Sequence, residues 1–396
     1  MSIESLRFLV VEDHSFQRWM LASMLQTLGA TQVFSAGDGQ SALGLLADLD
    51  PPVDIVITDL DMPGMDGMEF IRHLGQHWRH VSLVVVSALD PPLVSSVGLM
   101  ARAYGVKLLG AIEKPVNAAK LEQALALHSG ADEHLERASL VFSAGEIEKG
   151  LERGEFEAFF QPKVEMHSRR LTGAEANARW RHPQQGVIGP ASFIESLESS
   201  GLIEELTRIM LRSAAHHCRL WRSAGTDATV SVNLSQASLS DLTVAARMRS
   251  IVESERVEPD HVIFEVTESV AAGDPGHALE NLSRLRMMGF GLSIDDYGTG
   301  YSSMQRLSRV PFTELKIDQS FVRTAITEPS SRAVLESSLE MARKLRIDAV
   351  AEGVENQAQW NLLRELDCPL AQGYFVASPM DAGEFLDWVR RYRAVP

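Results

Sequence analysis

Short runs of apolar and β-branched residues alternate with longer amphipathic stretches in the first third of the chain. The longer stretches, such as Phe16–Leu28 and Gln40–Leu49, predict helices, and Leu121–Leu127 predicts the last helix of this region. The apolar runs predict five strands, at Leu6–Val11, Gln32–Ser35, Asp54–Thr58, Leu83–Val86 and Lys107–Ile112. Five β-α units of this kind indicate a parallel sheet that helices cover on both faces.

The same alternation resumes at about residue 146 and contains more units. A polar segment at 129–145 has no strand character and predicts a linker between two domains, at 5–128 and 146–396. The strands predicted in the second domain are Glu157–Val164, Leu171–Arg179, Thr229–Asn233, Val262–Val266, Gly291–Asp295, Thr313–Ile317, Ile347–Ala351 and Ala371–Phe375. This number of strands in about 250 residues is the size of a β/α barrel.

Charge and cysteine content narrow the class of protein. Asp and Glu number 53 against 37 Lys and Arg, which gives a formal net charge of −16 at pH 7. A surface this acidic repels phosphate backbones, so we expect no DNA partner. The two cysteines, Cys218 and Cys368, cannot build a disulfide framework. The start of the chain lacks a signal-peptide pattern and no apolar run is long enough to cross a bilayer, so we expect a cytoplasmic protein without a membrane partner.

Polar residues follow the predicted strands of the first domain. Glu12 and Asp13 follow the first strand, Asp59 the third and Ser87 the fourth, and Lys114 comes shortly after the fifth. In a parallel sheet these positions share the carboxyl edge, where ligands bind. Three carboxylates there favour a cation such as Mg²⁺, and a hydroxyl and a lysine can hold a phosphoryl group added to an Asp. Any one of these acids alone would be better explained as a solvated strand end or a helix cap, but the five together favour a site.

This arrangement, followed by Met62-Pro63-Gly64-Met65-Asp66-Gly67, resembles the receiver domain of bacterial two-component response regulators over residues 5–128. The resemblance implies a flavodoxin-like doubly wound fold and a sensor histidine kinase as partner. The roles that it implies are phosphate acceptor for Asp59, ligands of one Mg²⁺ for Glu12 and Asp13, and switch hydroxyl and lysine for Ser87 and Lys114. Ala111 stands where receivers usually carry an aromatic switch residue, so we expect the output to use a different rearrangement.

The second domain places polar residues in or after nearly every predicted strand. They are Glu175, Asn233, Glu265, Asp295, Asp296, Lys316, Glu352 and Gln372. Strand ends of a β/α barrel converge on its catalytic face, and oxygen ligands without Cys or His favour Mg²⁺ or Mn²⁺. Two such metal ions suit phosphodiester hydrolysis, in which Lys316 would orient the attacking water. Arg179 faces the same side of its strand as Glu175, and its fork can bind a phosphate.

Each of these residues has a simpler explanation when it is taken alone. Asn233 could be a turn residue, Lys316 a solvated charge, and Gly298-Thr299-Gly300 a flexible loop. Agreement among seven strand ends is hard to explain in that way, because clustered carboxylates mark sites. The pattern therefore favours a metal-dependent hydrolase over a purely structural barrel.

From about Glu155 to Asp387 the chain resembles the EAL phosphodiesterases, which hydrolyse cyclic di-GMP to linear pGpG. The motifs that carry the resemblance are Phe160-Gln161-Pro162, Gly173-Ala174-Glu175-Ala176, Arg179-Trp180-Arg181-His182-Pro183, Val232-Asn233-Leu234-Ser235, Glu265-Val266-Thr267-Glu268-Ser269, the nine residues DDYGTGYSS from Asp295, Leu315-Lys316-Ile317-Asp318, Ala351-Glu352-Gly353-Val354-Glu355 and Ala371-Gln372-Gly373-Tyr374. The implied fold is a modified TIM (β/α) barrel whose first strand runs antiparallel to the rest.

The resemblance also implies the roles of individual residues and a homo-oligomer, dimeric or larger. Two ions of Mg²⁺ or Mn²⁺ are implied, the first held by Glu175, Asn233, Glu265 and Asp295, the second by Asp295, Asp296 and Glu352. The implied catalytic residues are Glu175, Lys316 for the water and Glu352 as general base. The residues implied to contact the nucleotide or to support the site are Gln161, Arg179 and Gln372. Glu268 and Glu355 would position the loop that begins at Asp296 and couples the dimer interface to the metal site.

One position departs from the family signature. Asn177 replaces the leucine of Glu-Ala-Leu, and it faces the same side of the strand as Glu175. We expect it to lie near the site and to perturb metal affinity. Because every implied metal ligand is present, the sequence favours an active hydrolase whose turnover is modulated by phosphorylation of Asp59. The alternatives are an inactive EAL domain that acts as a cyclic di-GMP receptor through protein contacts, and a scaffold.

Overall fold

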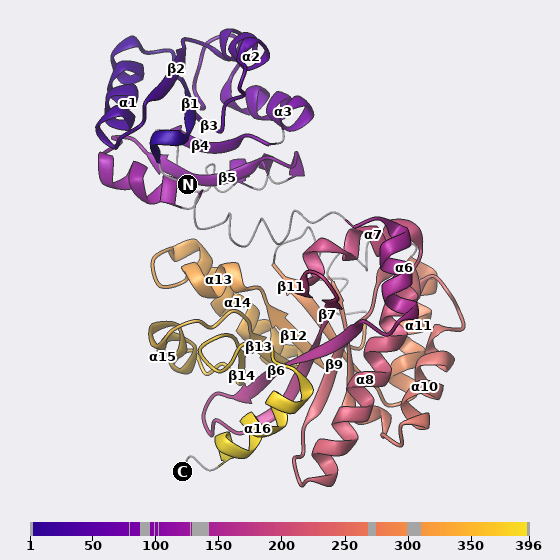
Figure 1. Ribbon diagram of the computed structural model, residues 1–396. Coiled ribbons are helices and arrows are strands. Elements are labelled where there is room, and N and C mark those ends of the chain that lie inside the picture. The colour runs from indigo at the N-terminus through magenta and orange to yellow at the C-terminus, as the bar shows by residue number, and fades with distance from the viewer. Residues whose placement is uncertain are drawn as a thin grey trace. The chain divides into compact units, whose positions relative to one another are not determined.

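A computed structural model describes residues 3–78, 80–87, 96–98, 100–101, 103–126, 128, 142–267, 275–298 and 310–393. The chain forms two compact units, Met1–Glu136 and Arg137–Pro396 (Figure 1). Within the described residues, no helix is long and apolar enough to cross a membrane. Most of the expected linker, at 129–141, lies outside the described residues, and a helix already begins at Ala144, inside its expected range.

The first unit contains a five-stranded sheet in the order β2-β1-β3-β4-β5, and every pair of neighbouring strands is parallel. Its strands are β1 (Arg7–Val11), β2 (Gln32–Ala36), β3 (Ile55–Asp59), β4 (Ser82–Ser87) and β5 (Lys107–Glu113). Its helices include α1 (Ser15–Thr27), α2 (Gly39–Asp48) and α3 (Gly67–His77), preceded by a 3-10 turn at Ile3–Ser5. Residues 96–98, 100–101, 103 and 118–126 are also helical. This strand order is that of a flavodoxin-like doubly wound fold, as the sequence predicts.

Two hydrophobic clusters lie on opposite faces of this sheet because successive residues of a strand point to opposite sides. Leu9 and Val11 of β1 pack in one cluster with α2 and α3, and Phe8 and Val10 pack in the other with α1. Both faces are therefore buried, and the strands read as almost continuous apolar runs. This burial leaves the carboxyl ends of the strands as the place for polar side chains.

The second unit is a closed barrel of eight strands. The order around it is β6-β14-β13-β12-β11-β10-β9-β7, and pairing between β6 and β7 closes it. The strands are β6 (Phe156–Glu165), β7 (Leu171–His182), β9 (Thr229–Asn233), β10 (Val262–Thr267), β11 (Gly291–Tyr297), β12 (Glu314–Ile317), β13 (Asp348–Ala351) and β14 (Leu370–Gln372), with β8 (Gly186–Ile188) beside β7. β6 is antiparallel to both of its neighbours, and the other barrel pairs are parallel, as predicted.

Helices surround the barrel (Figure 1). They are α6 (Ala144–Glu152), α7 (Ile194–Ser200), α8 (Ile203–Ser223), α9 (Gln236–Leu239), α10 (Val244–Ser254), α11 (Pro275–Met287), α13 (Gln319–Thr324), α14 (Pro329–Leu345), α15 (Gln357–Glu365) and α16 (Ala382–Arg393), with 3-10 turns at Pro190–Ser192 and Pro259–His261. Aromatic side chains join several of them to the strands: Phe160 of β6 meets Trp221 of α8 edge-on at 4.8 Å between ring centroids. Contacts of this kind hold helices and strands as one core.

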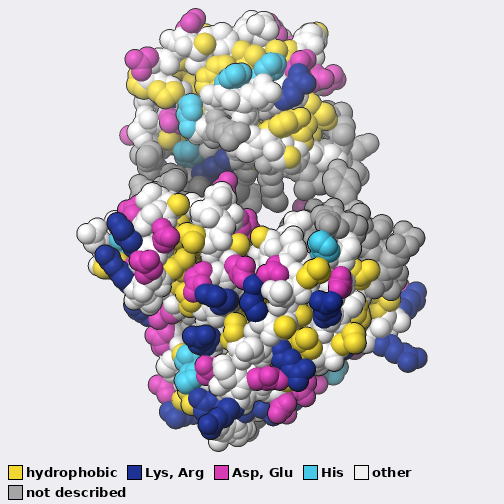
Figure 2. Space-filling model, turned by 90° about the vertical axis from the view of Figure 1, so that its right-hand side faces the viewer, with side chains coloured by type: hydrophobic (Ala, Val, Ile, Leu, Met, Phe, Trp, Pro, Cys, Tyr) yellow, Lys and Arg dark blue, Asp and Glu magenta, His cyan; other side chains and the backbone are white. Residues whose placement is uncertain are grey.

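The outer surface of the barrel unit carries charges of both signs. On the face in Figure 2, Lys and Arg side chains are interspersed with Asp and Glu. α10 and α11 each carry an ion pair between residues four apart, Arg249–Glu253 and Glu280–Arg284. Exposed pairs of this type contribute little to stability, so the fold depends on the apolar core.

The last predicted strand is shorter than expected. β14 ends at Gln372 instead of Phe375. A Cβ at Gly373 would lie 2.2 Å from the backbone nitrogen of Val354, so the chain turns here in close contact with the segment after β13. The amide of Phe375 then donates to the carbonyl of Val354 at 2.9 Å. The turn holds Gln372 at the carboxyl end of the barrel.

Candidate active site

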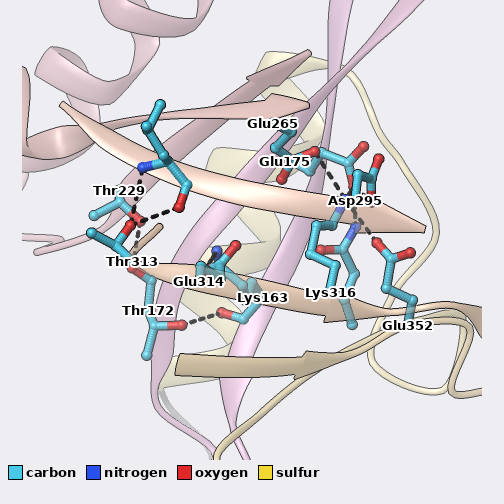
Figure 3. A network of polar contacts seen from close by, with 12 residues as sticks. Lys163, Thr172, Glu175, Thr229, Glu265, Asp295, Thr313, Glu314, Lys316 and Glu352 are labelled. Atoms are coloured by element: carbon cyan, nitrogen blue, oxygen red, sulfur yellow. Dashed lines mark hydrogen bonds and ion pairs between the residues drawn. The ribbon is translucent and has the colours of Figure 1, made fainter. Parts of the chain in front are cut away.

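The centre of the barrel site is Lys316, a fully buried lysine of β12 with 1% of its surface exposed. Its Nζ lies 2.7 Å from Glu352, 2.9 Å from Glu265, 3.0 Å from Asp295 and 3.5 Å from Glu175 (Figure 3). The four carboxylates come from β7, β10, β11 and the residue after β13. Barrel closure therefore brings together acids that are up to 177 residues apart in the sequence.

The acids in this cluster outnumber its cation, and their pKa values reflect the imbalance. Burial raises the pKa of Glu265 well above its ordinary value, and the charge of Lys316 only partly opposes this. Burial, together with the charge of Asp295, raises the pKa of Glu352 to about 8. For Glu175, burial would raise the pKa, but the charge of Lys316 and a hydrogen bond from Gln372 bring it below its usual value.

Lys316 itself stays charged despite its burial. Burial alone would lower the pKa of its ammonium group, but the surrounding carboxylates, Glu175 and Glu265 foremost, raise it well above its ordinary value. The ammonium group is thus a permanent positive charge in the floor of the site.

A bulge in β11 places two adjacent carboxylates on the same side. The register against β12 shifts between Ile294 and Tyr297, and Asp296 has a left-handed backbone with φ of 54°. In a regular strand Asp295 and Asp296 would point to opposite faces. Here carboxylate oxygens of Asp295, Asp296 and Glu352 all lie within 4.8 Å of one another, close enough to hold a metal ion.

Two glutamines hold Glu175 in place. The side-chain amide of Gln372 donates to Glu175 and also to Oε1 of Gln161, the latter at 3.0 Å. Gln161 in turn donates to the carbonyl of Ala377 at 3.2 Å. In this structure both glutamines therefore help to orient the carboxylate of Glu175, and contact of either with a nucleotide stays a prediction.

Arg179 and Asn233 border the cluster. Arg179 is half-buried, its guanidinium donates to the carbonyl of Ala178 at 2.8 Å, and it lies over the ring of Phe159. Burial lowers its pKa, and the nearby Tyr374 and Glu175 oppose that shift. Asn233 ends β9 as the register partner of Glu265, with its side chain exposed.

Of the two residues predicted to position the loop, Glu268 and Glu355, the structure describes only Glu355. Glu268 lies outside the described residues. Glu355 is exposed and forms an ion pair with Arg323 of α13 at 2.9 Å. Glu355 therefore links the segment after β13 to α13.

A second buried ion pair joins Lys163 of β6 to Glu314, the first residue of β12 (Figure 3). Both residues are 3% exposed, and they lie toward the opposite end of the strands from the acidic cluster (Figure 3). Thr172 donates to the carbonyl of Lys163 at 3.0 Å. No sequence signal identified this pair, because nothing but the closed barrel brings the two residues together.

The first unit has a smaller site of the same type. Nζ of Lys114 lies 2.6 Å from Asp59 and 3.0 Å from Glu12, and one carboxylate oxygen each from Glu12, Asp13 and Asp59 lie within 4.8 Å of one another. The amide of Leu60 donates to Asp59 Oδ1 at 2.6 Å. The structure thus brings together the acids and the lysine that the sequence predicts at this sheet edge.

Two further residues that the sequence singles out, Ser87 and Ala111, lie in β4 and β5. Ser87 is buried at the end of β4 and pairs in register with Glu113 of β5. Ala111, at the position where an aromatic residue is usual, is exposed on β5. Burial raises the pKa of Glu12, although Lys114 opposes that shift.

Comparison with known proteins agrees with this architecture. The family model of the EAL domain matches residues 144–379, and that of the response regulator receiver domain matches residues 8–126. The cyclic di-GMP phosphodiesterase RocR of Pseudomonas aeruginosa is 36% identical over 98% of this chain and 99% of its own length. The bifunctional diguanylate cyclase/cyclic di-GMP phosphodiesterase MucR of the same organism is 38% identical over 61% of this chain and 35% of its own length.

Solved structures give the same result for the barrel. The PaMucR phosphodiesterase in complex with c-di-GMP has a TM-score of 0.59 and 37% identity, over 61% of this chain and 98% of that one. The EAL enzyme Bd1971, in its form with cAMP and cyclic di-GMP bound, has a TM-score of 0.60 and 28% identity, over 70% and 77% of the two chains. The chain therefore belongs to the EAL domain family and joins its EAL barrel to a response regulator receiver domain.

Proposed function

We propose that this chain is a response regulator whose barrel hydrolyses cyclic di-GMP to linear pGpG with the help of divalent cations. The observation that carries the proposal is the convergence of four carboxylates from separate strands on the buried Lys316. The relative RocR, named as a cyclic di-GMP phosphodiesterase and similar along its whole length, supports the choice of substrate.

The chemistry of the cluster fits divalent cations. Its side chains offer carboxylate and amide oxygens, and one ammonium group cannot neutralise all the acids around it. We assign one ion of Mg²⁺ or Mn²⁺ to Glu175, Asn233, Glu265 and Asp295, and a second to Asp295, Asp296 and Glu352. When bound, such cations activate water as a nucleophile and neutralise charge that develops on the phosphodiester.

The chain's own residues supply the remaining steps. Glu352 takes the proton from the attacking water as general base, and Lys316 orients that water and stabilises negative charge on the phosphate. Arg179 binds a phosphate oxygen with its guanidinium fork. Gln372 and Gln161 act through Glu175, whose orientation they fix by hydrogen bonds.

The receiver takes part as a phosphorylation site in this proposal. Asp59 accepts a phosphoryl group from a sensor histidine kinase, and Glu12, Asp13 and Asp59 offer the oxygens for one Mg²⁺. Lys114, now paired with Asp59, then binds the oxygens of the added group. Phosphorylation of Asp59 modulates turnover in the barrel, and a homo-oligomer transmits the change.

The rival function is a receptor that binds cyclic di-GMP without cutting it. To separate the two, the full-length protein is incubated with cyclic di-GMP and Mg²⁺ or Mn²⁺, and the nucleotides are separated by chromatography. We expect linear pGpG to accumulate with repeated turnover. Saturable binding of intact cyclic di-GMP without product would reject the hydrolase in favour of the receptor.

A further inference from the structure

A cavity of about 470 Å³ lies beside the acidic cluster of the barrel. Asn233 and Glu265, two of the proposed metal ligands, form part of its wall. The rest comes from β7, from the end of β9 to the start of α9, from the end of β10, from the segment that includes α7, and from the first half of α8. A ligand whose phosphate lies at the cluster can therefore extend a neighbouring group into this cavity.

The walls of the cavity suit a flat, uncharged ring. Pro190, Ile194, Leu206 and Met210 supply apolar surface. The described residues that line the cavity include no Lys or Arg but do include carboxylates, Glu265 among them. A phosphate would be repelled here, whereas an aromatic base would bury its faces against apolar side chains.

Asn177 offers a hydrogen-bond donor to that ring. It lines the cavity, and its side-chain nitrogen Nδ2 is buried without a hydrogen-bond partner among the described residues. A buried amide nitrogen without a partner is unfavourable and uncommon in folded proteins. A ligand atom that accepts a hydrogen bond would satisfy it.

The position of Asn177 on β7 connects this donor to the rest of the site. Glu175, Asn177 and Arg179 follow one another at every second residue, on one side of the strand, with about 7 Å between successive side chains. The strand thus presents a metal ligand, an amide and a guanidinium in a row. Nucleotides carry acceptor atoms on the base and negative charge on the phosphate, which matches this row.

We propose that Asn177 is a specificity-determining residue that donates a hydrogen bond from Nδ2 to O6 of a guanine base lying in this cavity. The inference rests on the proposed function, because it takes the base from cyclic di-GMP. Both purines accept a hydrogen bond at N7, but only guanine accepts one at O6, where adenine carries an amino group that donates. Asn177 therefore favours the binding of guanine over that of adenine. Its main effect is on recognition of the base, whereas the sequence predicts an effect on metal affinity.

The test measures binding of cyclic di-GMP and cyclic di-AMP by calorimetric titration in Mg²⁺. Full-length Glu352→Gln protein is used so that turnover does not interfere, and the samples are analysed for product afterwards. Asn177→Leu restores the family residue, and Asn177→Ala only removes atoms, so at least one variant keeps the packing of the cavity. Asn361→Leu, an exposed asparagine on α15, is the matched control.

We expect both Asn177 variants to weaken cyclic di-GMP binding about tenfold, which is the size of one lost base contact, and to change cyclic di-AMP binding little. The Mg²⁺ concentration at half-maximal turnover of the corresponding Asn177 variants without the Glu352 change should match that of the wild type. Equal loss for both dinucleotides, no loss for either, or a shifted Mg²⁺ requirement with unchanged base preference would each overturn the proposal.

The outcome for the base contact of Asn177 can be distinguished from the outcome for the proposed function. If wild-type protein yields no pGpG but the Asn177 variants lose guanine preference in binding, the hydrolase proposal fails and the base contact stands. If wild-type protein yields pGpG and the variants keep full guanine preference, the base contact fails alone.

Discussion

At the scale of single residues, the barrel site combines one buried cation with more carboxylates than it can neutralise. Lys316 contacts four acids, and the pKa values of Glu265 and Glu352 are raised. Charges buried in this way stabilise a fold less than apolar groups of the same size would. Their arrangement is better explained by binding and catalysis than by stability.

Replacing Glu352 by Gln removes the proposed general base and one proposed metal ligand while keeping the shape of the side chain. We expect turnover of cyclic di-GMP to fall by about 10²- to 10⁴-fold, because a positioned base contributes this much. Glu340→Gln, on the exposed face of α14, is the control and should leave turnover unchanged. Near-normal turnover of Glu352→Gln, with an unchanged circular dichroism spectrum, would contradict the assignment.

At the scale of elements, short irregular segments place the side chains that the strands alone could not. The bulge in β11 directs Asp296 toward Asp295, and the turn at Gly373 holds Gln372 against Glu175. A non-glycine residue with positive φ, such as Asp296, costs energy that the surrounding structure must offset. Both irregularities lie at the carboxyl end of the barrel, next to the proposed chemistry.

Gly373→Ala should disturb the second of these segments. Its new Cβ would lie 2.2 Å from backbone atoms of Val354, so we expect the free energy of unfolding in urea to fall by about 1–3 kcal/mol. Turnover should fall as well, because Gln372 would shift relative to Glu175. Gly145→Ala, in helix α6 where the added Cβ meets nothing within 4 Å, should not destabilise the protein. Full stability and activity of Gly373→Ala would show that the turn tolerates a side chain.

Sequence reasoning predicted the elements that depend on local pattern. The alternation of apolar runs and amphipathic stretches predicted a doubly wound domain and a β/α barrel. The apolar runs before Glu265 and Glu352 marked these two acids as strand ends. It could not predict the bulge at Asp296, which depends on a shift of register against β12. Nor could it pair Lys163 with Glu314, 151 residues apart, because that contact requires the closed barrel.

At the scale of the whole molecule, two sites of the same physical type occur on one chain. Each has a lysine that contacts carboxylates at the carboxyl ends of parallel strands, Lys114 in the receiver and Lys316 in the barrel. A phosphoryl group on Asp59 would compete for Lys114 and so rearrange the first site. This rearrangement is the proposed input to the second.

Coupling between the units can be tested with a small phosphodonor such as acetyl phosphate. We expect the donor to change the turnover of cyclic di-GMP by wild-type protein and to leave that of Asp59→Asn unchanged, because Asp59 is the proposed acceptor of the phosphoryl group. Asp61→Asn, an exposed acid two residues away, should respond like the wild type. Identical turnover of all three proteins, with and without the donor, would remove the receiver from control of the barrel.

The most direct test of the central claim removes the cations from the complete protein. Full-length protein is freed of divalent metal with a chelator, and conversion of cyclic di-GMP to pGpG is followed before and after Mg²⁺ or Mn²⁺ is restored. The account predicts that turnover falls at least about 10²-fold without metal and recovers when either ion is added. Undiminished cleavage by the chelated protein would contradict it, because the acids around Lys316 would then serve some purpose other than holding catalytic cations.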